Sequence, residues 1–293
     1  MYYMLYGSLY LLSLLPFSIL YVISDLLYVT TYYIIGYRKD VVAGNLLIAF
    51  PQKTAWERKK IEKRFYRNLT DSFVETIKLL SISEKQFDER CSADLNIIRR
   101  LAAAGKNIQL QPVHQFNLEF YNLLYSKDLK DLRYIFIYMP FSSSAFERVY
   151  RKLRSRFGAV LIAATTFRNE RDKLKIHHAV TLMADQNPGN LHSAFWMRLF
   201  HEPVPFISGP GKVGVKNNSA IVFIEFVKIK RGYYSFKNTL LTEDASLLSA
   251  EEITKRYRDF MEEVINKEPA NYLWTHKRWK HKLTPEFEPL MIE

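Results

Sequence analysis

A histidine and a glutamate five residues apart form the most chemically suggestive pattern in this chain. His114 and Glu119 lie in "QPVHQFNLEF", directly after an extended apolar run. Residues five apart on a regular helix point about 140° away from each other, because one turn takes roughly 3.6 residues. The two side chains can meet only if His114 lies in a loop and Glu119 lies in the first turns of a helix. Such a strand–loop–helix unit would hold an imidazole against a carboxylate, as general-base catalysis requires. The alternative is a surface histidine near an unrelated glutamate.

Further polar side chains stand at the ends of other apolar runs. In α/β sheets, functional groups collect beyond the carboxyl ends of the strands, so these residues predict a basic, polar crevice around His114 and Glu119. Each arginine could instead lie on a solvated face. The aspartate in "DQNPGN" could instead form a turn, because that segment is rich in turn residues. The residues concerned are Arg151, Arg154, Arg156, Arg168, Asp185 and Gln186.

Short β-like runs alternate with helical stretches along most of the chain. Such alternation predicts an α/β domain with a largely parallel or mixed sheet covered by helices. Ser249 and Glu252 form a capping-box pattern for a late helix that continues to about Lys267. The β-like runs are 107–113, 133–138, 158–164, 180–184 and 219–227, and the other helical stretches are 55–81, 143–156 and 169–178.

The N-terminal segment predicts a membrane anchor. Residues 1–37 contain no Lys or Arg and one acid, Asp25, and a spanning helix needs about 20 mostly apolar residues. The segment lacks the basic start and the small-residue cleavage site of a signal peptide. Pro16 and Asp25 interrupt the run, so a kinked helix or a hairpin within one leaflet stays open, as does a buried core helix. We expect an anchor at 1–37 and one domain at 38–293.

Composition restricts the partners of the chain. The net charge of +12 favours acidic partners, and 15% aromatic residues with this basic excess favour a membrane surface over nucleic acid. The single cysteine excludes a disulfide framework and a Cys-rich zinc site. His177 and His178 are adjacent and point in different directions on either regular element, so we expect no metal.

Two further stretches admit several interpretations. "GPGKVG", 209–214, matches a dinucleotide fingerprint but lacks the acid required about 20 residues further on, so we interpret it as a tight turn and expect no cofactor. "YLWTHKRWK", 272–280, could lie at the membrane interface with Lys277, Arg278 and Lys280 on lipid phosphates. Stacking on nucleic acid and a purely structural role are its alternatives.

In this order, the segments resemble the bacterial late acyltransferases of lipid A biosynthesis, a branch of the lysophospholipid acyltransferase superfamily. The resemblance covers nearly the whole chain and rests on the N-terminal anchor and on "HQFNLE", "RKLRSRFG", "FRNE", "ADQNPGN", "PFISGPGK" and "YLWTHKRWK". It implies the glycerolipid acyltransferase-like fold, a central mixed sheet flanked by helices. It also implies transfer of an acyl chain from acyl carrier protein to a hydroxyl of a lipid A precursor, at the cytoplasmic face of the inner membrane.

The resemblance also implies roles for individual residues. His114 is similar to the family's catalytic base, Glu119 to its partner, Arg154 to the family arginine and Asp185 to the aspartate that closes a later strand. We expect Arg154 to stabilise the oxyanion of the thioester, and binding of a phosphate of the acceptor is its alternative role. The expected substrate-binding residues are Asn117, Arg151, Arg156, Arg168, Gln186 and Lys212.

Three departures from the family pattern leave the histidine and glutamate in place. Val113 stands where relatives usually have glycine, Leu118 where tryptophan is frequent, and Gly211 where many relatives have an acid. They leave the acceptor and the acyl length open. A lysophospholipid or aminolipid acyltransferase and a non-catalytic membrane scaffold are the alternative functions.

Overall fold

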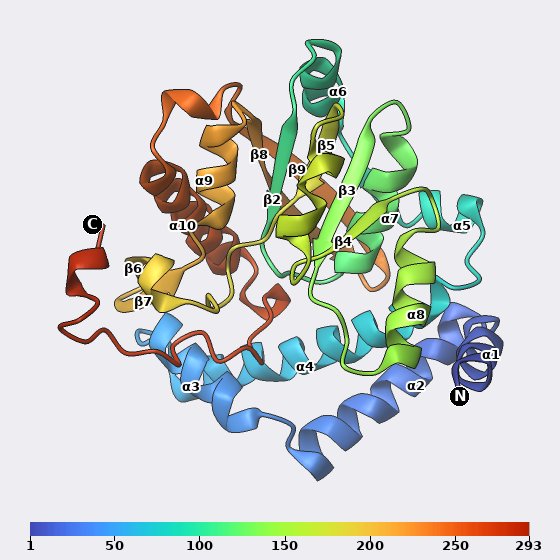
Figure 1. Ribbon diagram of the computed structural model, residues 1–293. Coiled ribbons are helices and arrows are strands. Elements are labelled where there is room, and N and C mark those ends of the chain that lie inside the picture. The colour runs from blue at the N-terminus through green and yellow to red at the C-terminus, as the bar shows by residue number, and fades with distance from the viewer. Residues whose placement is uncertain (293) are drawn as a thin grey trace.

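A seven-stranded mixed sheet forms the centre of the protein, shown as a computed structural model (Figure 1). The structure describes residues 1–292, apart from the side chains of Arg168, Arg171 and Lys173. Five strands in the order β8-β2-β5-β3-β4 run parallel, β9 is antiparallel to β8, and β1 is parallel to β9 at the edge. The predicted α/β class with a mixed sheet is therefore confirmed. The strands are β1 (Cys91–Ala93), β2 (Ile108–Pro112), β3 (Arg133–Tyr138), β4 (Val160–Ala163), β5 (His178–Thr181), β8 (Ala220–Lys230) and β9 (Tyr233–Thr242), with a separate antiparallel pair β6 (Phe195–Leu199) and β7 (Glu202–Phe206).

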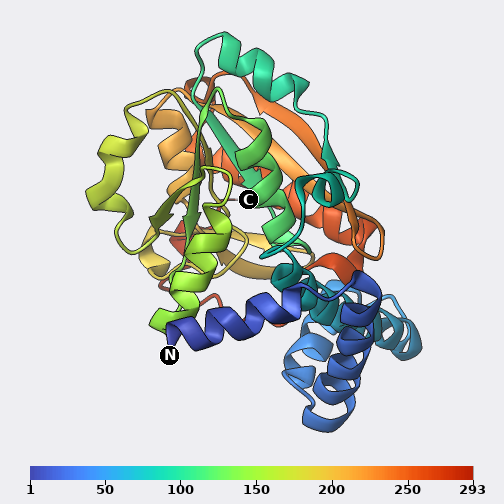
Figure 2. The ribbon, with the colours of Figure 1, turned by 90° about the vertical axis from the view of Figure 1, so that its right-hand side faces the viewer.

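Helices cover both faces of the sheet. Helices α9 and α10 lie on one face and α7 on the other, as the two side views show (Figures 1 and 2). The helices are α1 (Tyr2–Ser13), α2 (Phe17–Val29), α3 (Lys39–Ala49), α4 (Ala55–Lys78), α5 (Glu84–Asp88), α6 (Asn96–Ala103), α7 (Leu118–Asp128), α8 (Ser144–Arg154), α9 (Gly209–Lys216) and α10 (Ala250–Lys267). Short 3-10 turns occupy Phe167–Leu174, Leu191–Ser193, Ala245–Leu247, Pro269–Asn271 and Glu288–Leu290.

The two larger apolar cores lie on the two sides of the sheet. Tyr121 and Tyr125 of α7 pack on Phe226 and Phe236 of the β8–β9 hairpin. On the opposite face, Tyr257 of α10 packs edge to face on Phe223. Strand β2 lies between these cores, and all five of its residues are buried. Its carboxyl end is therefore held from both sides.

Helix α4 contacts this carboxyl end and begins with a full capping box. The Thr54 side chain accepts the backbone N–H of Glu57, and Glu57 in return accepts that of Thr54. The apolar Phe73 side chain of this helix is 51% exposed. The polar residues Asp71 and Glu75 are buried instead. Since α4 lies between the sheet and α2, it has two inner faces.

The apolar N-terminus folds into two helices with a break before Pro16. Helix α2 continues as a π-helical segment, Thr30–Ile35, and Phe17–Ile35 is 19 residues long and apolar enough to cross a membrane. One stripe of α2, with Leu20, Ser24 and Tyr28, is buried against α4, and Val22 and Leu26 on the other side are exposed. The division into 1–37 and 38–293 remains a prediction, and these contacts show how the two parts adjoin.

Two local predictions are wrong. The stretch 169–178 is a 3-10 helix that ends at Leu174, because His178 already pairs with Arg133 as part of β5. The "GPGKVG" stretch is helix α9 and not a tight turn. A side chain at Gly211 would place its Cβ 2.7 Å from the Ala250 carbonyl oxygen, so only glycine lets α9 lie this close to α10.

Candidate active site

The adjacent strands β2 and β5 each deliver one polar residue to the same edge of the sheet. They pair in parallel, so their carboxyl ends coincide. His114 follows β2 by two residues, and Asp185 follows β5 by four. The crevice expected beyond the strand ends thus brings these two residues together.

His114 binds Asp185 through two atoms. Its imidazole Nδ1 lies 2.6 Å from Oδ1 of Asp185, and its backbone N–H donates to Oδ2 at 3.0 Å. Burial alone raises the pKa of Asp185, but the attraction of His114 and the two hydrogen bonds outweigh it and hold that pKa below its ordinary value. An ionised carboxylate only accepts, so Nδ1 carries a proton, and in the neutral imidazole Nε2 then presents a lone pair. The His114 side chain is 21% exposed, whereas Asp185 is fully buried.

The predicted contact between His114 and Glu119 is wrong for this structure. His114 lies in the loop and Glu119 in the first turn of α7, as expected, but Glu119 binds Arg154 of α8. The Arg154 Nε donates to both carboxylate oxygens at 3.1 and 3.0 Å, and Nη2 donates as well. Burial would lower the pKa of Arg154, but the attraction of Glu119 raises it above its ordinary value. The carboxylate beside the imidazole is that of Asp185.

Asn117 fixes the start of α7, between the histidine and the glutamate. Its side-chain oxygen accepts the backbone N–H of Glu119, which makes it the N-cap of the helix. Its amide donates to the buried Glu75 of α4 at 3.1 Å. Asn117 itself is fully buried. The predicted substrate-binding role of Asn117 stays a prediction, and its contacts are those of a residue that positions the loop.

Glu75 is a functional candidate that the sequence analysis missed. Its carboxylate accepts hydrogen bonds from Asn117, from Tyr234 of β9 at 2.6 Å and from Tyr21 of α2 at 3.0 Å. Burial raises the pKa of Glu75 above its ordinary value, against the effect of these donors. One acid among the four of helix α4 gives no sequence signal of such a position. The network links the N-terminal helix to the loop of His114.

Most of the C-terminal segment 272–280 is core, whereas Lys277 and Lys280 are exposed and their contact with lipid phosphates stays a prediction. Tyr272, Trp274 and Arg278 are buried, so Arg278 does not reach lipid phosphates. Burial lowers the pKa of Arg278 to about 10, and its Nη1 donates to Asn187, two residues after Asp185. The Nε and Nη2 atoms of Arg278 have no hydrogen-bond partner among the described residues.

His276 ties the same segment to the loop of Asp185. Its Nε2 accepts the backbone N–H of Asn187 at 3.1 Å. Burial, and then the charge of Arg278, lower the pKa of His276 to about 4. His276 is therefore neutral at pH 7, which lets it accept this hydrogen bond. The 272–280 segment thus helps to hold the loop of Asp185 in place.

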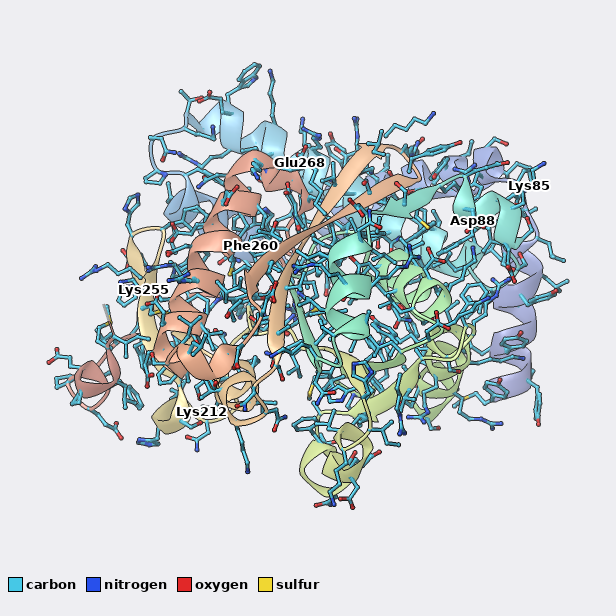
Figure 3. All side chains as sticks on the ribbon, turned by 90° about the horizontal axis from the view of Figure 1, so that it is seen from above. Lys85, Asp88, Lys212, Lys255, Phe260 and Glu268 are labelled. Atoms are coloured by element: carbon cyan, nitrogen blue, oxygen red, sulfur yellow. The ribbon has the colours of Figure 1, made fainter. Side chains whose placement is uncertain are left out.

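The other predicted substrate-binding residues lie in different settings. Arg156 donates to the carbonyls of Leu79 and Ile82, so it fastens the end of α4. Arg151 is half exposed and donates to the Tyr138 hydroxyl at 2.7 Å. Gln186 is partly buried next to Asp185, and Lys212 is exposed on α9 (Figure 3). The side chain of Arg168 lies outside the described residues. Among the described residues, no three His, Cys, Asp or Glu side chains gather as a metal site would require.

Comparison with known proteins gives this arrangement a family context. The family model for bacterial lipid A biosynthesis acyltransferases matches residues 1–281. The chain belongs to this family. It is 24% identical over 279 residues to the lipid A biosynthesis palmitoleoyltransferase of Escherichia coli (strain K12), covering 94% of this chain and 89% of that protein. A lipid A biosynthesis acyltransferase of Shigella flexneri matches equally well. This lipid A acyltransferase family implies a lipid substrate and membrane association.

Proposed function

We propose that this lipid A acyltransferase family member transfers an acyl chain from acyl carrier protein to a hydroxyl of a lipid A precursor. The net charge of +12 suits an acidic donor protein, and the apolar helix Phe17–Ile35 suits a lipid acceptor. The chain after Tyr37 is basic, which suits the anionic surface of the cytoplasmic leaflet of the inner membrane. Whether the acyl group is lauroyl, myristoyl or another chain is decided by the product analysis below.

The hydrogen-bonded pair of His114 and Asp185 carries this proposal. Nε2 of His114 removes the proton of the acceptor hydroxyl as its oxygen attacks the thioester carbonyl carbon. The C–S bond then breaks, and the thiolate takes the proton from the imidazolium. Asp185 fixes the Nδ1–H tautomer and stabilises the imidazolium while it exists. A positioned base of this kind contributes about 10²–10⁴-fold.

Glu119 and Arg154 act in this proposal as one buried unit. Glu119 is 6% exposed and Arg154 is 7% exposed, so neither charge can be removed alone without leaving the other unpaired. The pair fixes α7 to α8 behind His114. Arg154 stabilises the thioester oxyanion through Nη1, because Nε and Nη2 already donate hydrogen bonds to Glu119.

The N-terminal helix lies along the membrane surface in this proposal and does not cross the bilayer. Asp25 stands in the middle of the helix and binds Arg231 at 2.7 Å, and Ser24 beside it donates to Asp71 of α4 at 2.8 Å. A charged residue at the centre of a spanning helix costs about 2.5–3.5 kcal/mol. The polar stripe faces the domain, and the exposed apolar stripe remains for lipid.

The test is a single substitution with a matched control. His114→Ala should abolish acyl transfer in a purified assay with acyl carrier protein and a lipid A precursor. It should also abolish the corresponding product in the lipids of cells, measured by mass spectrometry. His201→Ala, an exposed histidine of the β6–β7 turn, is the control and should keep full activity. Unchanged transfer by His114→Ala overturns the assignment, and a lysophospholipid or aminolipid product would replace the acceptor.

A further inference from the structure

A basic pocket lies between α2, α4 and the turn of the β8–β9 hairpin. Its volume is about 670 Å³. Five cationic side chains line it, against two acids, Asp25 and Asp71. The five cations are Arg64, Arg67, Lys228, Lys230 and Arg231. No residue of the candidate active site lines this pocket.

Three of the cations are already neutralised. Arg231 binds Asp25 and Asp71, and Lys228 binds Asp71 at 3.3 Å. Arg64 binds Glu268, an acid outside the pocket lining, at 2.9 Å. The pairs of Asp71 with Lys228 and Arg231 form the floor of the pocket, since the Asp71 side chain is only 4% exposed.

The other two cations, Arg67 and Lys230, have no acidic partner among the described residues. The Arg67 guanidinium lies 5.1 Å from the centre of the Tyr28 ring, and the Lys230 ammonium lies 4.1 Å from that of Tyr233. Both side chains are exposed. Their donors are therefore available to an anion, and an arginine fork with a neighbouring ammonium suits a phosphate.

The rim of the pocket is apolar on the lipid-facing side. Val29 of α2 and Ile229 of the hairpin turn line the pocket and are 45% and 64% exposed. Leu26 on the adjoining turn of α2 is 64% exposed. Figure 1 shows α2 along the outer side of α4, away from α9 and α10. A ligand with its phosphate on Arg67 and Lys230 could thus lay its hydrocarbon along α2.

We propose that this pocket binds the phosphate headgroup of an anionic phospholipid from the membrane that holds α2. The occupant is a lipid, because the free cations adjoin exposed apolar side chains of the anchor helix. An acidic protein surface would contact the apolar side chains of Val29 and Ile229 at the rim. Its carboxylates would not reach the recessed floor of the pocket. The inference does not depend on acyl transfer, and its test measures binding alone.

The experiment measures equilibrium binding of labelled short-chain phosphatidylglycerol to the full-length protein in a neutral detergent. Saturable binding is expected, with no competition from short-chain phosphatidylcholine or from an equal concentration of inorganic phosphate. Arg67→Gln with Lys230→Gln should weaken binding about 20- to 30-fold, since each cation contributes about 1 kcal/mol at an anionic surface. Circular dichroism should show both proteins folded alike.

The matched control removes two charges from the same stripe of α4 outside the pocket. Lys60→Gln with Lys63→Gln leaves the pocket lining intact and should retain wild-type binding. Equal weakening by both double variants would show a diffuse charged surface and overturn the pocket. Displacement by inorganic phosphate would overturn the lipid as ligand. A third outcome would replace the lipid by a protein. In that outcome acidic carrier protein binds only when Arg67 and Lys230 are present, and phosphatidylglycerol does not bind.

Discussion

Asp185 accepts both the imidazole Nδ1–H and the backbone N–H of His114, at 2.6 and 3.0 Å. One carboxylate thus fixes the position of the loop and the orientation of the ring. Because Asp185 is fully buried, water does not compete for these two hydrogen bonds. The imidazole therefore presents Nε2 without having to reorganise when the acceptor binds.

Asp185→Asn should separate the two effects. The amide oxygen of asparagine can still accept one N–H, but its charge is gone and the tautomer of His114 is no longer fixed. We expect the catalytic rate to fall by about 10³–10⁴-fold, with the apparent affinity for the acceptor little changed. Steady-state kinetics at several acceptor concentrations measures both. A rise in the apparent Michaelis constant at an unchanged rate would place Asp185 in acceptor binding.

The buried pair of Glu119 and Arg154 permits a double-mutant test. Glu119→Leu leaves an unpaired guanidinium in the interior and should cost about 3–5 kcal/mol of stability. Adding Arg154→Met should restore most of that stability, because it removes the orphaned charge. Denaturant unfolding of four proteins, the wild type, Glu119→Leu, Arg154→Met and the double variant, measures the coupling free energy between the two residues.

The acyl-transfer activity of the same four proteins shows whether the pair of Glu119 and Arg154 has only a structural role or also stabilises the oxyanion. If the pair only fixes α7 to α8, the restored double variant should also regain most of its acyl transfer. If Arg154 stabilises the oxyanion, the double variant stays about 10²–10³-fold slow although it is folded. Arg154→Lys should rescue poorly, because an ammonium lacks the planar fork.

The N-terminal helix should be needed for folding and not only for attachment. Leu20 is fully buried against α4, so Leu20→Ala should destabilise the protein by about 2–5 kcal/mol. Val22→Ala, on the exposed stripe of the same helix, is the control and should stay within about 0.5 kcal/mol. Removal of residues 1–36 should yield unstable or aggregated protein. A stable, active truncated domain would contradict this.

His276 should make stability depend on pH. Its pKa in the folded protein is about 4, below the ordinary value of 6.5, so the unfolded chain binds more protons between these values. The contribution of neutral His276 should be complete above about pH 6.5 and lost as the pH falls towards 4. His276→Gln keeps an acceptor that does not titrate in this range. Thermal unfolding of both proteins across this window should show a smaller loss in the variant.

Helices and strands could be predicted from the sequence where a short segment shows its apolar pattern without reference to the rest of the chain. The β-like runs 107–113, 133–138 and 219–227 contain β2, β3 and most of β8, and β3 and β8 are largely continuous apolar runs, as buried strands tend to be. Strand β9 was missed, since three consecutive polar residues, 237–239, interrupt its apolar pattern. The wrong prediction for 209–214 has a tertiary cause: glycines suggested a turn, but Gly211 is required by contact with Ala250.

The residues of the candidate site could be predicted from the sequence, but which of them bind each other could not. His114 and Asp185 form a hydrogen-bonded pair, and Glu119 and Arg154 form a buried ion pair. Which carboxylate binds which cation depends on the order of strands, and β2 lies next to β5 only through a crossover. Closeness in sequence favoured Glu119 as the partner of His114. Sheet topology favours Asp185, 71 residues away.

The single layer of α4 between the N-terminal helix and the loop of His114 has a geometric consequence. Glu75 of α4 accepts hydrogen bonds from Tyr21 of the N-terminal helix and from Asn117 of the loop of His114, so α4 holds that helix and that loop in one fixed arrangement. With α2 in the plane of the leaflet, the base then stands at a fixed height above the hydrocarbon. The enzyme would select a hydroxyl by its depth in the bilayer, while the acceptor diffuses in two dimensions and never leaves the membrane.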